Sequence, residues 1–194
     1  MTKASTSLLV ILSLLTALST ARLFPLGLDL AFPSMGHQIL DARLMFLLHI
    51  SAASVALACG ALQIIAAVRK RYLNVHRWVG RLYALAVLLA SFSGFLIAFQ
   101  IAGIIGTTGF ALLAVIWLIV TGQAVRLART HQIQAHRRWM ICSFALTFAA
   151  VSLRLQLAIF MFGLSMPYEQ VYPFLAWSCW VPNLVFALWY VGRS

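Results

Sequence analysis

The chain has 194 residues, of which 63% are hydrophobic and only 9% are charged, and its mean hydropathy is +0.99. A soluble domain carries about 25% charged residues, so this chain cannot cover a water-facing surface and must turn its surface to lipid. The net charge of +11 does not indicate nucleic-acid binding, because the basic residues lie in short links between apolar runs. We therefore expect a membrane protein whose main partner is the lipid bilayer, with no nucleic-acid partner.

Six apolar runs are long enough to cross about 30 Å of hydrocarbon at about 1.5 Å per residue in an α-helix. They predict an all-α fold, with residues 1–194 forming a single transmembrane domain of six helices. We expect helices 2–5, about 43–163, to form the core, with helices 1 and 6 peripheral. The expected spans are 6–24, 43–68, 78–102, 107–127, 137–163 and 171–191.

Glycine and proline mark the expected boundaries between these helices. Gly103 and Gly106 should separate the third helix from the fourth, and Pro167 the fifth from the sixth. Pro182 lies inside the sixth run and should kink it, since proline interrupts the hydrogen bonds of a helix. The first run resembles a signal peptide, but its basic start is weak, so we interpret it as an uncleaved first helix.

The distribution of Lys and Arg predicts the orientation of the chain, because cytoplasmic links are enriched in both. If six helices are crossed, eleven of the fourteen basic residues fall on one side, which predicts a multi-pass protein with both termini in the cytoplasm. These eleven are Lys3, Arg69, Lys70, Arg71, Arg77, Arg81, Arg126, Arg129, Arg137, Arg138 and Arg193. The other side holds Arg22, Arg43 and the three acids Asp29, Asp41 and Glu169.

A shift of 60 residues superposes several polar positions of the chain. It places Gln63 on Gln123, and His76-Arg77 on His136-Arg137. Helices 2–3 and 4–5 could therefore be two copies of one hairpin in the same membrane orientation, since parallel repeats occur in polytopic proteins. The alternative is that two unrelated links both needed basic residues.

Polar residues inside the bilayer indicate a first candidate site. His49 and Gln63 lie on one face of helix 2, with small residues between them. Arg154 lies past the middle of helix 5, where an arginine costs a few kcal/mol without a partner. Asp41, Glu169 or an anionic ligand could supply that partner, or the side chain could bind helix-end carbonyls or extend outward to the interface. The candidate residues for a small lipophilic or anionic ligand are His49, Gln63, Gln123 and Arg154.

Two histidines indicate a second candidate site. His76 shares a helical stripe with Tyr83, and His136 shares one with Ser143 and Thr147. Two histidines at matched depth on different helices are what bis-imidazole ligation of haem iron requires, so haem b is a possible cofactor. Both could instead contact only lipid phosphates at the interface. The arginines that could neutralise haem propionates are Arg77, Arg81, Arg137 and Arg138.

Other catalytic signatures are missing from the sequence. It contains no Ser-His-Asp set, HExxH motif, P-loop or CxxC motif, and its three acids disfavour catalysis by a carboxylate pair. The cysteines Cys59, Cys142 and Cys179 fit no zinc spacing and are expected to be buried packing residues. Whether the chain is an enzyme stays open from the sequence, and oxidoreductase activity is expected only if haem is bound.

Three runs carry a resemblance to a known family: LHISAASVALACGALQIIAAVRKRYLNVHRWVGRLY, IWLIVTGQAV and HQIQAHRRWMICSFALTFAAVSLRLQL. Over about residues 43–160 the chain resembles the bacterial predicted-membrane-protein family known as domain of unknown function 2306. That resemblance implies a multi-helix protein of the bacterial inner membrane and no established activity. More loosely, the chain resembles transmembrane b-type cytochromes with four histidine-bearing helices, although Gly109 stands at the repeat position that matches His49.

Three functions remain open from the sequence. The first is a cofactor-free binding or transport protein for a small lipophilic or anionic molecule. The second is a b-type haem protein that transfers electrons through His76 and His136. The third is a membrane scaffold or accessory subunit in which the polar residues only pack helices.

Overall fold

The computed structural model describes residues 3–31, 42–101 and 103–193, apart from the side chains of residues 3, 24 and 29. Every regular element in these ranges is helical, which confirms the all-α prediction. Six helical stretches among them are long and apolar enough to span a membrane, starting at residues 4, 43, 73, 104, 133 and 168. The chain is thus an integral membrane protein of six transmembrane helices.

The described residues form ten α-helices, a short 3-10 helix (η1) and a π-helix (η3), and the six spans include all but two of the α-helices. In chain order the elements are α1 (Lys3–Ser19), η1 (Thr20–Arg22), α2 (Leu23–Ala31), α4 (Arg43–Ile64), α5 (Ala66–Arg71), α6 (Leu73–Ala98), α7 (Ile104–Arg129), α8 (Ile133–Thr147), α9 (Ala149–Leu157), η3 (Ala158–Gly163), α10 (Tyr168–Ser178) and α11 (Val181–Gly192). The short elements mark kinks and interfacial turns, so a single span is often made of two or three of them.

The third and fifth spans begin earlier than the sequence predicts. Helix α6 starts at Leu73 and not at 78, and α8 starts at Ile133 and not at 137. Charged residues in the first turn do not end a helix at the membrane edge, because long arginine side chains reach back to the interface. His76 and His136 are consequently each the fourth residue of their helix.

Three of the four predicted glycine and proline positions mark breaks in the structure, whereas Gly106 lies inside α7, because that helix already begins at Ile104. Gly103 separates α6 from α7 with φ of 87°, a conformation that favours glycine. Pro167 precedes α10, and the sixth span breaks after Ser178, with Pro182 in the first turn of α11. The predicted kink at Pro182 is therefore confirmed.

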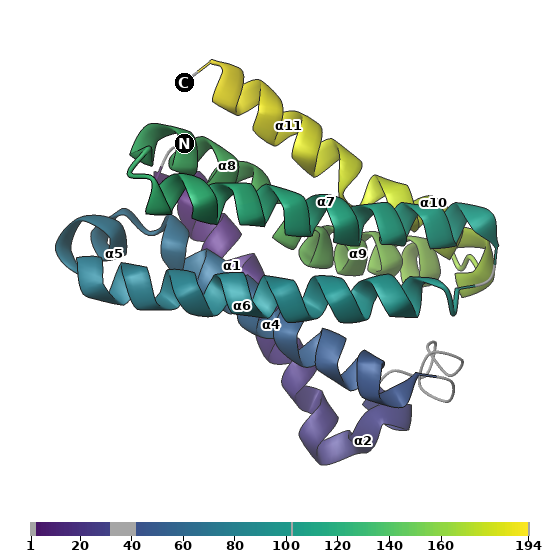
Figure 1. Ribbon diagram of the computed structural model, residues 1–194. Helices are drawn as coiled ribbons and strands as arrows, with labels where there is room; N and C mark the ends of the chain where they lie inside the picture. The colour runs from purple at the N-terminus through teal and green to yellow at the C-terminus, as the bar shows by residue number, and fades with distance from the viewer. Residues whose placement is uncertain (1–2, 32–41, 102, 194) are drawn as a thin grey trace.

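The bundle is organised around four long helical segments (Figure 1). Helix α4 packs on α6, α6 packs on α7, and α7 packs on α8. Helix α1 contacts α4, while α10 contacts α7, so the first and last spans flank these four. Figure 1 also shows α11 leaning away from the bundle, and both termini lie at the same end of the molecule.

Small residues bring the central helices close together. Ala56 and Ala90 are fully buried, and Gly60 lies against two aromatic rings. A Cβ atom at Gly60 would lie 2.8 Å from Phe144 Cδ2 and 3.2 Å from Tyr83 Cε2. Because lipid tails are as apolar as side chains, such close van der Waals packing is a main source of helix association in membranes.

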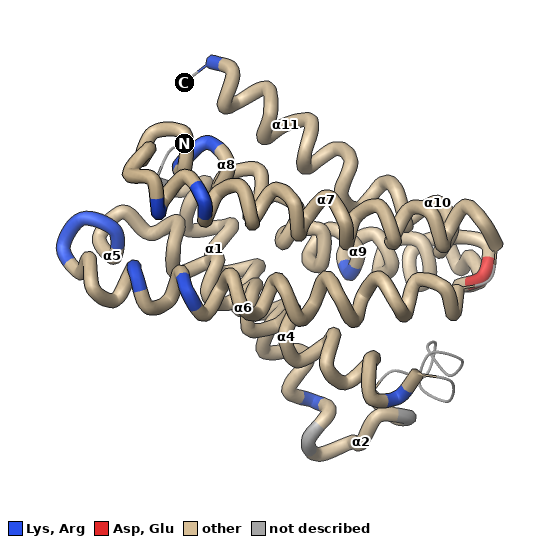
Figure 2. The backbone as a smooth tube through the Cα atoms, viewed as in Figure 1, with Lys and Arg blue, Asp and Glu red and all other residues tan. Residues whose placement is uncertain are grey.

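The charged residues divide the molecule into two ends (Figure 2). Lys and Arg gather around α5 and the α7–α8 turn, at the end where both termini lie, and we call this the basic end. Glu169 lies at the opposite end, in the first turn of α10. The even number of spans puts the two termini on one side, and their location in the cytoplasm stays a prediction.

Candidate functional site

A cluster of polar side chains lies in the middle of the bundle, where α6, α7 and α8 meet. This hydroxyl cluster consists of Tyr83, Trp117, Thr121, Ser143 and Thr147, all buried. The Tyr83 hydroxyl lies 2.7 Å from Ser143 Oγ and 2.6 Å from Thr147 Oγ1. Ser143 Oγ lies 2.7 Å from Thr121 Oγ1, and Trp117 Nε1 donates to Thr147 Oγ1 over 3.1 Å.

The protons of the hydroxyl cluster can all be assigned. The Thr147 hydroxyl donates to the Ser143 carbonyl over 2.9 Å, so Tyr83 must donate to Thr147. Tyr83 then accepts from Ser143, and Ser143 accepts from Thr121. Each of the four hydroxyl protons thereby has an acceptor within the cluster, and the acceptor for Thr147 is the Ser143 backbone carbonyl. A network this well satisfied fixes how helices pack, and it offers no free group to a ligand.

His49 lies on α4, on the far side of the hydroxyl cluster from the basic end. Its Nδ1 donates to the Ala90 carbonyl over 2.9 Å, which leaves Nε2 with the free lone pair. The ring fills the space beside Gly94, where a Cβ atom would lie 2.8 Å from ring Cε1. His49 is therefore held against α6 by one hydrogen bond and by close packing.

Arg154 of α9 is close enough to His49 for the two side chains to interact electrostatically. Its Nη1 donates to the Ala150 carbonyl over 3.1 Å, and its Nη2 reaches Thr20 Oγ1 at 3.4 Å. Thr20 comes from η1 in the first span, an element that sequence analysis did not connect with this site. We call Thr20, His49 and Arg154 the arginine group.

No carboxylate of the described side chains pairs with Arg154. Glu169 is the only acid whose side chain the structure describes, and it makes no ion pair with Arg154. Asp41, the other predicted partner, lies outside the described residues. Another cation, Arg22, is close enough to affect Arg154 electrostatically. The guanidinium thus carries five N–H donors, of which two are used.

Gln63 lies at the opposite end of α4 from His49, so it is not part of the arginine group. Its Nε2 donates to the His76 carbonyl over 2.7 Å. The amide packs on Gly80, where a Cβ atom would lie 3.3 Å from Gln63 Nε2. Gln63 therefore ties the end of α4 to the first turn of α6. In the described part of the chain, Gln123 makes no equivalent hydrogen bond.

His76 and His136 both lie at the basic end, and we call them the histidine pair. They interact electrostatically, and each lies two helical turns from a residue of the hydroxyl cluster, Tyr83 or Ser143. His136 Nδ1 donates to the Ala124 carbonyl over 2.8 Å. His76 Nδ1 is shielded from solvent and has no hydrogen-bond partner among the residues that the structure describes.

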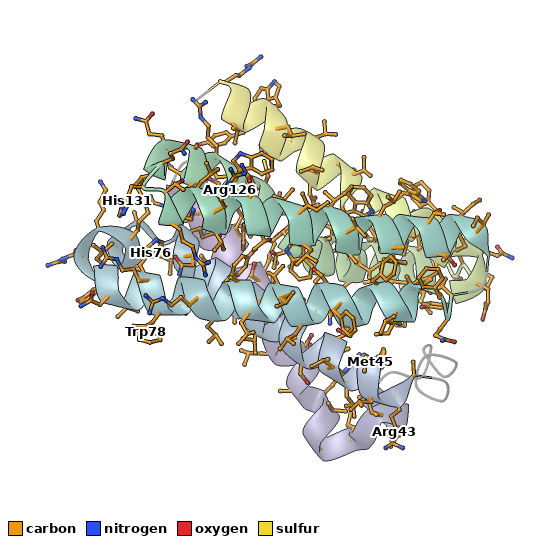
Figure 3. All side chains as sticks on the ribbon, in the orientation of Figure 1. Arg43, Met45, His76, Trp78, Arg126 and His131 are labelled. Atoms are coloured by element: carbon orange, nitrogen blue, oxygen red, sulfur yellow. The ribbon has the colours of Figure 1, made fainter. Side chains whose placement is uncertain are left out.

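The arginines predicted beside the histidines are all exposed. Arg81 stacks on the ring of Trp78, with its Cζ atom 4.6 Å from the ring centroid. Figure 3 shows His76 and Trp78 leaving α6 on opposite sides, so this stack faces away from the histidine pair. Arg138 lines a surface groove, and no hydrogen bond joins Arg77 or Arg137 to a histidine in the described residues.

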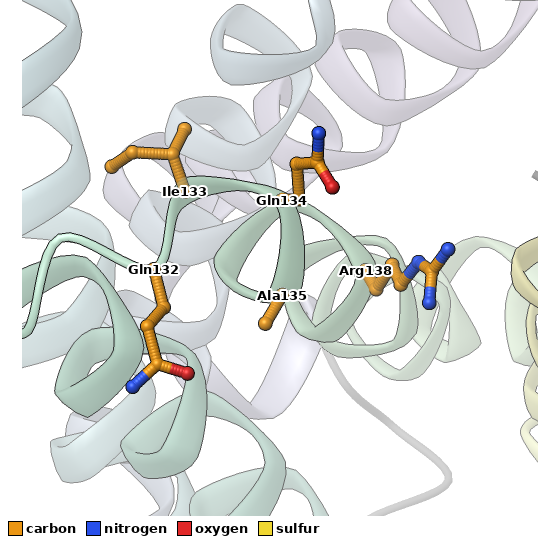
Figure 4. A pocket seen from close by; sticks show the side chains of 5 residues that line it. All are labelled: Gln132, Ile133, Gln134, Ala135 and Arg138. Carbon is orange, nitrogen blue, oxygen red and sulfur yellow. The ribbon is translucent and has the colours of Figure 1, made fainter.

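Two open grooves lie at the basic end. The first, of about 410 Å³, follows the first turn of α8 and is lined by Gln132, Ile133, Gln134, Ala135 and Arg138 (Figure 4). The second, of about 370 Å³, is lined by residues 71–75 before and within the first turn of α6. The two grooves lie at sequence positions about 60 residues apart, and neither groove extends to the arginine group.

Several contacts join residues that the 60-residue shift relates. Tyr83 bonds directly to its counterpart Ser143, and His76 interacts with His136. The carbonyls that accept from His49 and Arg154 belong to Ala90 and Ala150, which are also 60 residues apart. Such pairs are expected along an axis that relates two parallel repeats. This pattern supports the duplication, which stays a prediction.

The apolar spans, the basic end and the buried polar groups together define a polytopic α-helical membrane protein. Residues 46–191 match the family described as Predicted membrane protein (DUF2306), and the chain belongs to that family. The match includes the histidine pair, the hydroxyl cluster and two members of the arginine group. No curated protein and no solved structure matches the chain significantly.

Proposed function

We propose that this membrane protein binds a small amphiphile with a carboxylate or phosphate head, and that the head contacts Arg154. The supporting observation is an arginine in a transmembrane helix that uses two of its five donors and has no described carboxylate partner. An intramembrane arginine in that state costs several kcal/mol unless an anion or water meets it. An anionic head would remove much of that cost.

The neighbours of Arg154 favour an anion over a neutral ligand. Arg22 contributes a further positive charge nearby, and the Thr20 hydroxyl lies within reach of the same head group. The Nε2 atom of His49 can accept a proton or a hydrogen bond from a protonated head. Arginine binds carboxylate and phosphate through two parallel hydrogen bonds, which lysine does not provide.

The apolar surroundings favour a ligand that arrives from the membrane. Arg154 is half-buried, while Leu155 and Ile159, one and five residues further along, expose 48% and 59% of their surface. The helix after Leu157 widens into the π-helix η3, a distortion that often occurs at functional sites. A bound amphiphile would leave its tail along this face, in contact with lipid. The grooves at the basic end lie too far away to hold the same head.

The test compares dodecanoate and dodecyl phosphate with dodecanol, using the full chain in a neutral detergent. We expect both anions to raise the thermal unfolding temperature and dodecanol to leave it unchanged. Arg154→Gln should weaken anion binding roughly 10- to 100-fold, because a charge-assisted hydrogen bond contributes about 1.5–3 kcal/mol. Arg154→Lys should give an intermediate loss. Arg138→Gln removes an exposed charge at the basic end and is the matched control.

Two results would contradict this function. One is equal stabilisation by dodecanol and dodecanoate, which would show that the apolar tail alone, and not the anionic head, stabilises the protein. The other is unchanged anion affinity in Arg154→Gln. If Arg154→Gln does not fold, Thr20→Val provides a second check, because it removes the hydroxyl beside the guanidinium, leaves the charge in place and should weaken anion binding by less than Arg154→Lys does. A chain that binds none of the three compounds would support the scaffold alternative.

A further inference from the structure

The geometry of α6 and α8 places His76 and His136 on the helix faces that approach each other at the hydroxyl cluster. Tyr83 and Ser143 touch through their hydroxyl groups at 2.7 Å. Seven residues are almost two full helical turns, so a residue seven positions earlier projects from the same face, about 10 Å along the axis. His76 and His136 occupy those positions on the two helices. The faces that meet at the hydroxyl cluster therefore also carry the histidine pair.

The hydrogen bonds of His136 leave one nitrogen ready to ligate. A backbone carbonyl only accepts, so the bond of 2.8 Å to Ala124 places the proton on Nδ1 and the lone pair on Nε2. Metal-binding histidines usually donate their other ring N–H to a carbonyl or carboxylate in this way, which fixes both tautomer and ring orientation. His136 thus has the second-shell contact of a ligand.

His76 contributes an unusual buried atom. Its Nδ1 is shielded from solvent and has no partner among the described residues. A buried ring nitrogen without a partner is unfavourable, so such an atom is expected to meet a group from outside the chain. The backbone of His76 is fixed by Gln63, whose amide donates to the His76 carbonyl over 2.7 Å.

We infer that His76 and His136 jointly ligate a transition-metal centre at the basic end of the bundle, each through one imidazole nitrogen. Imidazole suits iron, copper, nickel and zinc. No group of three His, Cys, Asp or Glu side chains that could hold a metal occurs among the described residues. The chain therefore supplies two ligands, and the others come from water for a free ion or from a porphyrin for haem iron. This site is independent of the arginine group.

The positive charges near His76 affect a free metal ion and haem iron differently. Arg69 and Arg77 are close enough to His76 to act on it electrostatically, and they repel a free divalent cation. Haem iron is accompanied by two propionates, which arginines neutralise. Both sources share bis-imidazole ligation, and one experiment with two arms distinguishes them.

The experiment titrates the purified full chain with Cu²⁺ or Ni²⁺ in one arm and with ferric haem in the other, followed by absorbance. We expect one equivalent to bind in at least one arm, and a low-spin ferric spectrum if the haem arm binds. His76→Ala and His136→Ala should each lower the affinity at least about tenfold. His131→Ala is the matched control, because His131 is an exposed histidine in the α7–α8 turn, at the same end of the bundle.

Each possible result of this experiment either supports or overturns the inference. Binding in one arm identifies the source of the metal, and binding in both supports the shared ligand set. The inference is overturned if neither arm binds, if the two histidine variants bind as the wild type does, or if His131→Ala loses as much affinity. Should an alanine variant fail to fold, His76→Gln and His136→Gln replace it. The Gln63 bond uses the His76 backbone carbonyl and is retained in all of these variants.

Discussion

Replacing Tyr83 by phenylalanine removes one oxygen atom from the centre of the hydroxyl cluster. The side chain is 1% exposed, and its hydroxyl makes two hydrogen bonds of 2.7 and 2.6 Å. Ser143 then loses the acceptor of its proton, whereas Thr147 keeps Trp117 as a donor. The variant therefore loses two bonds, but it leaves only one buried donor to find a new acceptor.

The size of this effect follows from the two lost bonds. A hydrogen bond between transmembrane helices contributes about 0.6 kcal/mol on average and about 1.7 kcal/mol at most. Two of them give about 1–3 kcal/mol, and an unsatisfied Ser143 proton moves the value toward the upper end. We expect Tyr83→Phe to lower the free energy of unfolding by that amount, with the fold retained, since the ring still packs on Gly60.

The assay is reversible unfolding by sodium dodecyl sulfate in mixed micelles, followed by tryptophan fluorescence. Tyr72→Phe is the matched control, because Tyr72 is 59% exposed and should be neutral. A double-mutant cycle with Ser143→Ala should give a coupling energy of about 0.5 kcal/mol or more, since the two hydroxyls are in direct contact. A destabilisation below about 0.3 kcal/mol, or additive effects in the cycle, would refute the proposed order of donors and acceptors.

Two further predictions concern glycines that contact other helices. Gly60→Ala should destabilise by about 1–3 kcal/mol, because its methyl group would lie 2.8 Å from Phe144 in a closely packed core. Gly94→Ala should displace the His49 ring, which its methyl group would approach to 2.8 Å, and should weaken anion binding at the arginine group. Gly122→Ala is the control for both, since nothing lies within 4 Å of its Cβ position and alanine favours a helix. Thermal unfolding and dodecanoate titration measure these effects, and equal stability of all three variants would contradict the packing argument.

The number and approximate position of the spans could be predicted because they depend on hydrophobic length alone. The helix starts at Leu73 and Ile133 were not predicted. A polar first turn resembles a connecting link in the sequence, but in the structure its side chains are solvated at the membrane interface while the backbone is already helical. Local signals such as Pro182 and Gly103 predicted breaks correctly, because their backbone restrictions act without tertiary context.

The candidate sites were harder to predict than the spans. Helical periodicity placed Tyr83 and Ser143 on inward stripes, but it does not say which stripes meet, so the hydroxyl cluster had no signal of its own. Thr20 joins Arg154 over 134 residues of chain, a contact that no local pattern encodes. Gln63 was grouped with His49 because both lie on one face of α4, yet 14 residues of helix separate them by about 21 Å.

The position of the hydroxyl cluster also bears on whether the chain only binds an amphiphile or moves it. The arginine group and the basic end lie on opposite sides of this buried layer, which offers no free donor to an anion. An anionic head can cross the bundle only if the Tyr83–Ser143 contact opens. In a transporter, Tyr83→Phe should therefore speed the flux of dodecanoate through proteoliposomes while lowering stability. In a static binding protein it should lower stability alone, with dodecanoate affinity at Arg154 unchanged in both cases.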